Sequence, residues 1–227
     1  MNDIKELLKS LSIEPTNLEL YILALTHSSY NADAKTKHHD YERLEYIGDA
    51  VLGFVVADLI YRTYDKMEPG EMSKLRSYIV KSKSLADNAR KLELHKYILA
   101  GHSIDHHQIY SSDKILEDAF ESLIGAIYLD CGIDVVYRYI SNIVIDQIRS
   151  IDLDVLTDYK TKLQEEMQAE YRNSVHYRLV SMSGPAHERH FVCEVLFNDL
   201  VLARGEGKSK KAAEENAAKN ALLKRSV

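Results

Sequence analysis

The chain has 227 residues, of which 45% are hydrophobic and 28% charged, a balance typical of a globular protein and not of a disordered one. The longest apolar run, residues 50–57, is too short to cross a bilayer, and residues 1–10 lack the apolar segment of a signal peptide. The two cysteines, Cys131 and Cys193, are far apart, so we expect a reducing cytoplasm rather than a disulfide framework.

The charge of the chain is unevenly distributed. The net charge is −6, but residues 1–155 hold 17 Lys and Arg against 25 Asp and Glu, whereas residues 156–227 hold 12 against 10. The acidic excess therefore belongs to the first part. The basic residues of the second part gather near its end, which keeps nucleic acid open as a partner. We expect the boundary within residues 150–157, with one domain over 1–150 and another over 157–226.

The first part has the apolar spacing of successive helices and no convincing strand. Pro69-Gly70 predicts a turn, and the polar segments 31–40 and 101–112 are expected to be irregular. The predicted helices cover residues 4–10, 18–24, 41–64, 73–80, 85–92, 114–129 and 134–148.

The second part alternates in a different way. Turn signals at Ser183-Gly184-Pro185 and Asn198-Asp199 separate segments with the period of strands. We predict a helix over 158–171, strands over 175–182, 190–197 and 200–204, and an alanine-rich helix over 209–224. The fold class is therefore α+β, an all-α domain followed by a small α-β-β-β-α domain.

Carboxylates recur on one face of the long helix 41–64. At about 100° per residue, Glu42, Glu45 and Asp49 lie within an arc of about 60°. The rest of that helix is apolar nearly all round, so we expect it to be buried, with its acids facing protein or a closed cleft. A later helix repeats the pattern, because Asp118 and Glu121 are three residues apart and share a face.

Glycines on these helices, Gly48 and Gly125, would allow a close approach that brings four carboxylates together. Such acids repel one another, and a hard divalent cation such as Mg²⁺ relieves the repulsion through oxygen ligands. A metal held there can activate a water and stabilise the leaving oxygen of a phosphodiester. The alternative is an ordinary network of ion pairs with Arg43, Arg76 or Lys114. The four acids in question are Glu45, Asp49, Asp118 and Glu121.

At this point the sequence resembles the ribonuclease III family. The segment Glu42-Arg-Leu-Glu-Tyr-Ile-Gly-Asp-Ala-Val-Leu52 is similar to the family's signature motif, and the second part resembles a double-stranded-RNA-binding domain. Three further segments agree in order with the family: Ala24-Leu-Thr-His-Ser28, Gly70-Glu-Met-Ser-Lys-Leu-Arg76 and Glu117-Asp-Ala-Phe-Glu-Ser-Leu-Ile-Gly125.

The resemblance implies an endonuclease that cuts double-stranded RNA into ends with 5′-phosphates, 3′-hydroxyls and short 3′ overhangs. It implies Mg²⁺ as cofactor, with Mn²⁺ as a substitute, and a homodimer with one centre in each subunit. Processing of ribosomal and other structured precursor RNAs follows from the same resemblance. The implied catalytic and metal-binding acids are Glu45, Asp49, Asp118 and Glu121, with Asp49 and Glu121 the most sensitive, while Glu42 lies nearer the RNA or the subunit interface.

Two positions depart from the family pattern. Where the family usually has a phenylalanine that inserts into the partner subunit, this chain has Tyr46, whose hydroxyl needs a partner or water. The family often has an acid directly before Gly70, but Pro69 stands there and Glu68 is one residue earlier. We therefore assign no auxiliary acidic role to Glu68.

The end of the chain has the character of a phosphate clamp. Lys208, Lys210 and Lys211 surround the start of the last predicted helix, where backbone N–H groups and the helix dipole favour anions. A solvated helix end is the alternative for lysines alone. Duplex RNA is recognised mainly by shape, so no base-specific contacts are expected. By resemblance, Gln164, Glu165 and His187 match positions that touch minor grooves.

Other candidates receive plainer interpretations. His102, His106 and His107 lie in a polar segment and are expected to be surface histidines, and His27 is interpreted as structural. No glycine-rich nucleotide loop is present, so we expect no nucleotide cofactor. Two competing functions remain: a dimeric RNA-binding protein with inactive acidic helices, and a helical adaptor whose second domain contacts proteins.

Overall fold

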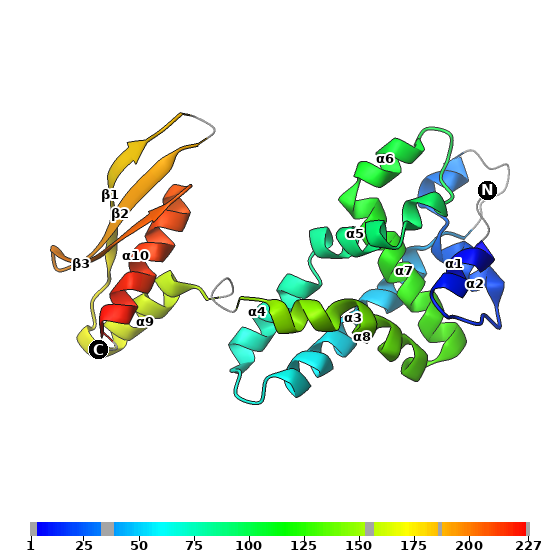
Figure 1. The fold of residues 1–227 in the computed structure, drawn as a ribbon, viewed down its shortest axis with the longest axis horizontal. Helices are drawn as coiled ribbons and strands as arrows, with labels where there is room; N and C mark the ends of the chain where they lie inside the picture. The colour runs from blue at the N-terminus through cyan, green and yellow to red at the C-terminus, as the bar shows by residue number, and fades with distance from the viewer. Residues whose placement is uncertain (1–3, 33–38, 153–156, 186–187, 226–227) are drawn as a thin grey trace. The chain divides into compact units, whose positions relative to one another are not determined.

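The computed structural model describes residues 4–32, 39–152, 157–185 and 188–225. The chain divides into two compact units, Met1–Leu156 and Thr157–Val227 (Figure 1). None of the described helices is long and apolar enough to cross a membrane.

The first unit is helical, which confirms the predicted class. Its described residues contain no strand, only one parallel bridge between Thr26 and Leu99. The α-helices are α1 (Ile4–Ser10), α2 (Leu18–Ala24), α3 (Glu42–Thr63), α4 (Pro69–Ile79), α5 (Ser82–Lys91), α6 (His106–Ser111), α7 (Asp113–Cys131) and α8 (Ile133–Ser150), with short 3₁₀ turns at Ser28–Ala32 and Leu94–Lys96.

Helices α3 and α7 form the centre of this unit. Their backbones meet at Gly48 and Gly125, as the sequence predicted: a Cβ on Gly48 would lie 1.8 Å from the Glu121 carbonyl oxygen. A Cβ on Gly125 would lie 2.2 Å from the carbonyl oxygen of Leu44. Around this contact the two helices bury apolar side chains in the main core of the unit, including Leu52, Val55, Val56, Phe120, Leu123 and Ile124. The contact therefore fixes how far apart the acid-bearing segments lie.

Helices α4 and α6 differ from the prediction because capping was overlooked. Helix α4 begins at Pro69, not at residue 73, because Glu68 and Glu71 form a capping box and proline suits the first helical position. Residues 106–111 were expected to be irregular but form α6, where Asp105 accepts from the Gln108 N–H at 2.7 Å. The histidines of this segment, His102, His106 and His107, are exposed, as predicted.

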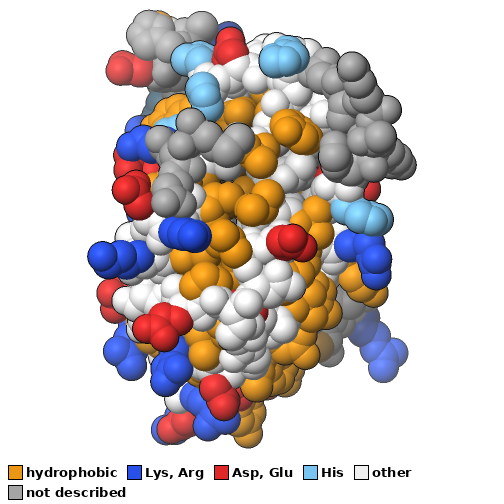
Figure 2. Space-filling model, turned by 90° about the vertical axis from the view of Figure 1, so that its right-hand side faces the viewer, with side chains coloured by type: hydrophobic (Ala, Val, Ile, Leu, Met, Phe, Trp, Pro, Cys, Tyr) orange, Lys and Arg blue, Asp and Glu red, His pale blue; other side chains and the backbone are white. Residues whose placement is uncertain are grey.

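The expectation that α3 is buried all round was wrong. Tyr46, Phe54 and Tyr61 have exposed fractions of 80%, 59% and 70%. These aromatic side chains are largely exposed on one side of α3, so apolar composition did not imply burial here. Figure 2 shows a face of the molecule on which hydrophobic side chains gather in a central patch with charged side chains around it.

The second unit has the predicted α-β-β-β-α order. Its elements are α9 (Tyr159–Tyr171), β1 (His176–Ser183), β2 (His190–Phe197), β3 (Leu200–Gly207) and α10 (Lys210–Arg225). The strands form an antiparallel sheet in the order β1-β2-β3. Strand β3 extends three residues beyond the predicted end, because Gly205 and Gly207 still pair with Cys193 and Phe191.

The core of the second unit lies between the sheet and its helices. Leu163 and Met167 of α9 pack with Val195 of β2 and with Ala217 and Ala221 of α10. Figure 1 shows α10 lying along the sheet. The small side chains of α10 permit this close packing, and the N-terminal end of that helix remains in contact with solvent, since Lys210 and Lys211 are exposed.

Candidate active site

The acids of α3 and α7 line one pocket of about 570 Å³, called here the acidic pocket. Helix α3 begins at Glu42 and α7 runs past it at the glycine contact, so acids on facing sides of both helices meet. The residues that line the pocket are His27, Ser28, Tyr41, Glu42, Glu45, Tyr46, Asp49, Lys114, Asp118 and Glu121.

A tighter group lies inside this pocket. Carboxylate oxygens of Glu45, Asp118 and Glu121 lie within 4.8 Å of one another. Asp118 and Glu121 are buried, with exposed fractions of 6% and 7%. Asp49 lines the same pocket but is exposed and stands outside the tight group. The structure thus brings three of the four predicted acids within reach of one ion and leaves the fourth at the edge.

The acids of the pocket outnumber the basic groups beside them, and this excess of negative charge shifts their pKa values. Burial, together with the nearby charges of Asp49 and Glu117, raises the pKa of Glu121 to about 8. Burial, followed by the charge of Asp118, also raises the pKa of Glu45. Three carboxylate oxygens at this spacing are hard donors of the kind that Mg²⁺ and Mn²⁺ take, so the residues fit a divalent ion.

One basic side chain enters the pocket. The Lys114 Nζ lies 2.6 Å from Asp118 Oδ1 and 3.5 Å from Glu45 Oε1. Of the three basic residues that the sequence suggested as ion-pair partners of the acids, Lys114 forms such pairs. Among the described residues, neither Arg43 nor Arg76 forms an ion pair with these acids.

Two aromatic residues, Tyr41 and His27, support the pocket. The role of Tyr41 was not predicted from the sequence. Tyr41 lies one helical turn before Glu45, and its hydroxyl donates to Asp118 Oδ2 at 3.2 Å. The His27 ring packs edge-on against Tyr41, with ring centroids 5.6 Å apart. The Ser29 backbone N–H donates to His27 Nδ1 at 3.0 Å, which fixes the ring. The interpretation of His27 as structural overlooked that it lines the acidic pocket.

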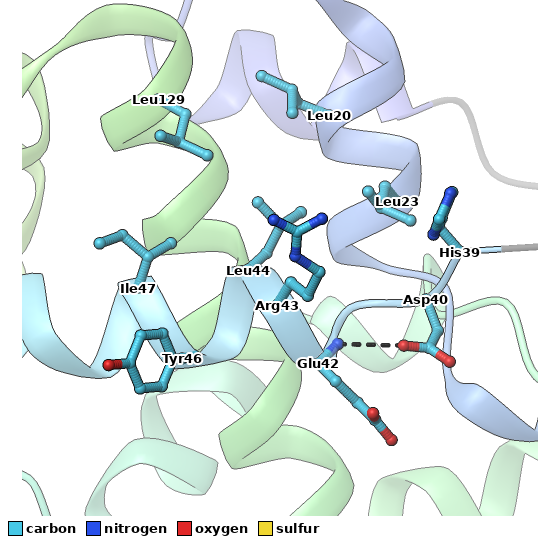
Figure 3. Close-up of a pocket in the computed structure, with 10 residues that line it drawn as sticks. All are labelled: Leu20, Leu23, His39, Asp40, Glu42, Arg43, Leu44, Tyr46, Ile47 and Leu129. Carbon is cyan, nitrogen blue, oxygen red and sulfur yellow. Dashed lines mark hydrogen bonds between the residues drawn. The ribbon is translucent and has the colours of Figure 1, made fainter.

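An apolar groove of about 750 Å³ lies beside the acidic pocket (Figure 3). Leu20 and Leu23 of α2 face it from one side, and Ile47 of α3 and Leu129 of α7 from the other. Tyr46 lines both the groove and the acidic pocket. The same is true of Glu42, which is exposed at the beginning of α3.

The predicted RNA-contacting residues of the second unit divide into three groups. Lys208, Lys210 and Lys211 are exposed around the start of α10. Glu165 is exposed on α9, whereas Gln164 is half-buried and its side chain binds within the unit. His187 lies outside the described residues.

The internal bonds of Gln164 hold the middle of α9 to the loop before β1. Its Nε2 donates to the Ser174 Oγ at 3.0 Å, and its Oε1 accepts from the Val175 N–H at 3.1 Å. An RNA contact by this side chain would therefore compete with bonds that it already makes.

The two units of the structure match the models of two different known protein families. A model described as ribonuclease-III-like matches residues 17–148, and a model of the double-stranded RNA binding motif matches residues 159–225.

Known proteins resemble the chain over nearly its whole length. Proteins named ribonuclease 3 are 40% identical in Onion yellows phytoplasma, over 99% of this chain and 92% of that protein, and 40% identical in Streptococcus pyogenes serotype M2, over 98% and 97%. The crystal structure of the nuclease domain of ribonuclease III from Campylobacter jejuni is 35% identical, with a TM-score of 0.60 over 67% of this chain and all of that one. A second structure of that nuclease domain, described as flexible in the region involved in dimer formation, is 36% identical, with a TM-score of 0.57 over 62% of this chain and 98% of that one.

Proposed function

Because the chain belongs to the ribonuclease III family and is a double-strand-specific endoribonuclease, we propose that it hydrolyses both strands of an RNA duplex with Mg²⁺ in the acidic pocket. We assign catalysis to residues 1–150 and duplex binding to residues 157–226. The observation that carries the proposal is the group of three carboxylates within 4.8 Å, held by two helices in backbone contact.

We assign the metal-binding role to Glu45, Asp118 and Glu121. A bound Mg²⁺ or Mn²⁺ ion supplies an acidified water and a positive charge for the developing oxyanion. The burial of Asp118 and Glu121 keeps bulk water from their carboxylates and strengthens their attraction for a cation.

Asp49 has a different assignment. Its carboxylate is exposed at the edge of the pocket, near the charge of Glu121, and so is free to accept hydrogen bonds from a water molecule. We propose that Asp49 orients the attacking water. The water oxygen bonds to phosphorus and gives up one proton to solvent, while the bond to the 3′ oxygen breaks and that oxygen takes up a proton from solvent, which gives 5′-phosphate and 3′-hydroxyl ends.

We further propose that the enzyme is a homodimer with one acidic pocket for each RNA strand, which gives short 3′ overhangs. Tyr46 is 80% exposed beside the apolar groove, so a ring from one subunit and a groove from the other are complementary in character. Burial of an exposed aromatic side chain in an apolar groove is favourable through the hydrophobic effect. This pairing supports an interface next to the acidic pocket, with Glu42 between the two.

We assign the second unit to duplex binding by shape and charge. Lys208, Lys210 and Lys211 present positive charge around the N-terminus of α10, where phosphates are favoured. Glu165 and His187 are proposed minor-groove contacts, and Gln164 is one only if it gives up its bonds to the 174–175 loop. We expect structured precursor RNAs, including ribosomal ones, as substrates in the cytoplasm.

The test is cleavage of a long RNA duplex with Mg²⁺, with chelator, and by the variant Asp49→Asn. Asp49 is exposed, so the variant is expected to keep its fold and its RNA affinity while cleavage falls by about a hundredfold or more. Asp146→Asn makes the same change at an exposed position of α8 that does not line the pocket, and should cleave normally. Tight binding without metal-dependent cutting by the unmodified chain would leave only an RNA-binding protein.

A further inference from the structure

The carboxylate of Asp118 is held on both of its oxygens by groups of different kinds. The Tyr41 hydroxyl donates to Oδ2, and the Lys114 ammonium lies against Oδ1. Tyr41 is 3% exposed, whereas the Lys114 side chain is 68% exposed. A buried ring leaves its place only if the core opens, but an exposed lysine turns into solvent by rotation about its side-chain bonds.

The ammonium of Lys114 also lies against a second acid, at 3.5 Å from Glu45. Glu45 and Asp118 are two of the three residues whose oxygens form the tight group. The same oxygens are the hard donors that a divalent ion requires. Because like charges at contact distance repel strongly, an ammonium and a divalent ion do not occupy these oxygens together.

We propose that Lys114 is a displaceable counter-ion of the acidic pocket: a divalent ion binds by exchange with its ammonium group, while Tyr41 keeps Asp118 in position. This inference rests on the proposed function, which assigns Glu45 and Asp118 to the metal. Lys114 moderates the repulsion among the acids until a cation of higher charge replaces it. The lysine thereby raises the concentration of divalent ion that the enzyme needs.

The alternative is an ordinary surface ion pair within α7, since Lys114 and Asp118 are four residues apart. Such a pair stabilises its helix whether or not a metal is bound. An exchangeable counter-ion stabilises the fold only while no divalent ion is present. The two explanations therefore differ in a quantity that does not involve cleavage.

The first experiment measures Mn²⁺ binding by calorimetry without RNA, in the full chain and in Lys114→Met. Loss of the competing cation is expected to tighten binding by about fivefold, the upper value for an exposed ion pair. Lys96→Met removes another exposed lysine, which pairs with Glu93 outside the pocket, and should leave the affinity unchanged. Unchanged or weaker Mn²⁺ binding in Lys114→Met would overturn the exchange.

The second experiment measures thermal unfolding of the same proteins. Lys114→Met is expected to unfold at a lower temperature than the unmodified chain in chelator, and at the same temperature in saturating Mn²⁺. A deficit that persists in saturating Mn²⁺ would identify Lys114 as a plain structural ion pair and overturn the proposal.

Tyr41→Phe is expected to weaken Mn²⁺ binding, whereas Lys114→Met is expected to tighten it. The variant keeps the ring but removes the donor to Asp118, and supporting hydrogen bonds of this kind change metal affinity by about tenfold or more. Tyr64→Phe is the matched control, because it removes a hydroxyl that donates to the Ile148 carbonyl at 2.6 Å. Equal Mn²⁺ affinities in both phenylalanine variants would remove Tyr41 from the proposal.

These measurements are independent of the nuclease assignment. If the unmodified chain cuts duplex RNA but Lys114→Met binds Mn²⁺ normally, only the exchange fails. If Mn²⁺ binding responds as expected but no variant or parent cuts RNA, the proposed reaction fails and the exchange stands.

Discussion

Glu121 makes the stability of the protein depend on pH and on bound metal, because ionisation of a buried acid without a nearby cation lowers the free energy of unfolding. The pKa of Glu121 is raised from 4.5 to about 8 by burial and by the charges of Asp49, Glu117, Glu45 and Asp118. Between these values the folded chain holds a proton that the unfolded chain has lost. The free energy of unfolding in chelator therefore falls as pH rises from about 4.5 to about 8.

The magnitude follows from the same values. Between pH 5.5 and 8, one carboxyl with this shift lowers the free energy of unfolding by at most about 3 kcal/mol. Water entering the pocket and the nearby Lys114 reduce this, so we expect about 1 to 2 kcal/mol. Glu121→Gln has no proton to lose, and its stability in chelator should depend less on pH by that amount.

The assay is urea unfolding followed by circular dichroism at both pH values, in chelator and in Mg²⁺. All other titrating groups are common to both proteins, so the difference between them isolates Glu121. Mg²⁺ should restore the stability of the parent at pH 8 and leave Glu121→Gln nearly unchanged, and the variant should not cut RNA. The same pH dependence in both proteins would refute the argument that its surroundings raise the pKa of Glu121.

Three further predictions concern the helix contact, the dimer and the RNA. Gly48→Ala should destabilise the first unit by about 3 kcal/mol or more in thermal unfolding, because its Cβ would meet a backbone carbonyl, whereas Gly53→Ala, with no atom within 4 Å of its Cβ, should be neutral or stabilising. Tyr46→Asp should give monomers in sedimentation analysis with weak cleavage; a fully active monomer would contradict the dimer. Lys208→Ala with Lys211→Ala should weaken duplex binding and flatten its dependence on salt concentration, measured from 50 to 200 mM; an unchanged salt slope would exclude these lysines from phosphate contact.

Much of the fold follows from periodicity in the sequence. The long helices and the strand order were predicted closely because many residues contribute to each pattern. The glycine contact between α3 and α7 could also be predicted, because Gly48 and Gly125 stand beside the acids in both helices. Boundaries were less accurate where one cap decides them, as at Pro69 and Asp105.

The site was harder to predict where a contact joins distant segments. Tyr41 reads as an apolar residue at a helix start, and nothing local indicates that its hydroxyl reaches Asp118, 77 positions away. His27 lies in another segment, so its packing on Tyr41 depends on the tertiary fold. The exposure of Phe54 and Tyr61 was missed because apolar composition does not reveal which side of a helix stays exposed. The assignments of individual residues to metal and RNA stay predictions.

Because Gly48 and Gly125 place backbone against backbone, the spacing of the two acid-bearing helices does not depend on the size of any side chain. Glu45 and Asp49 each follow a residue of that contact, and Glu121 belongs to it. Substituted side chains at these positions would project from the same rigid frame. The helix pair is thus a template for engineering: imidazole or thiolate ligands introduced there would favour softer metals such as zinc without moving the helices.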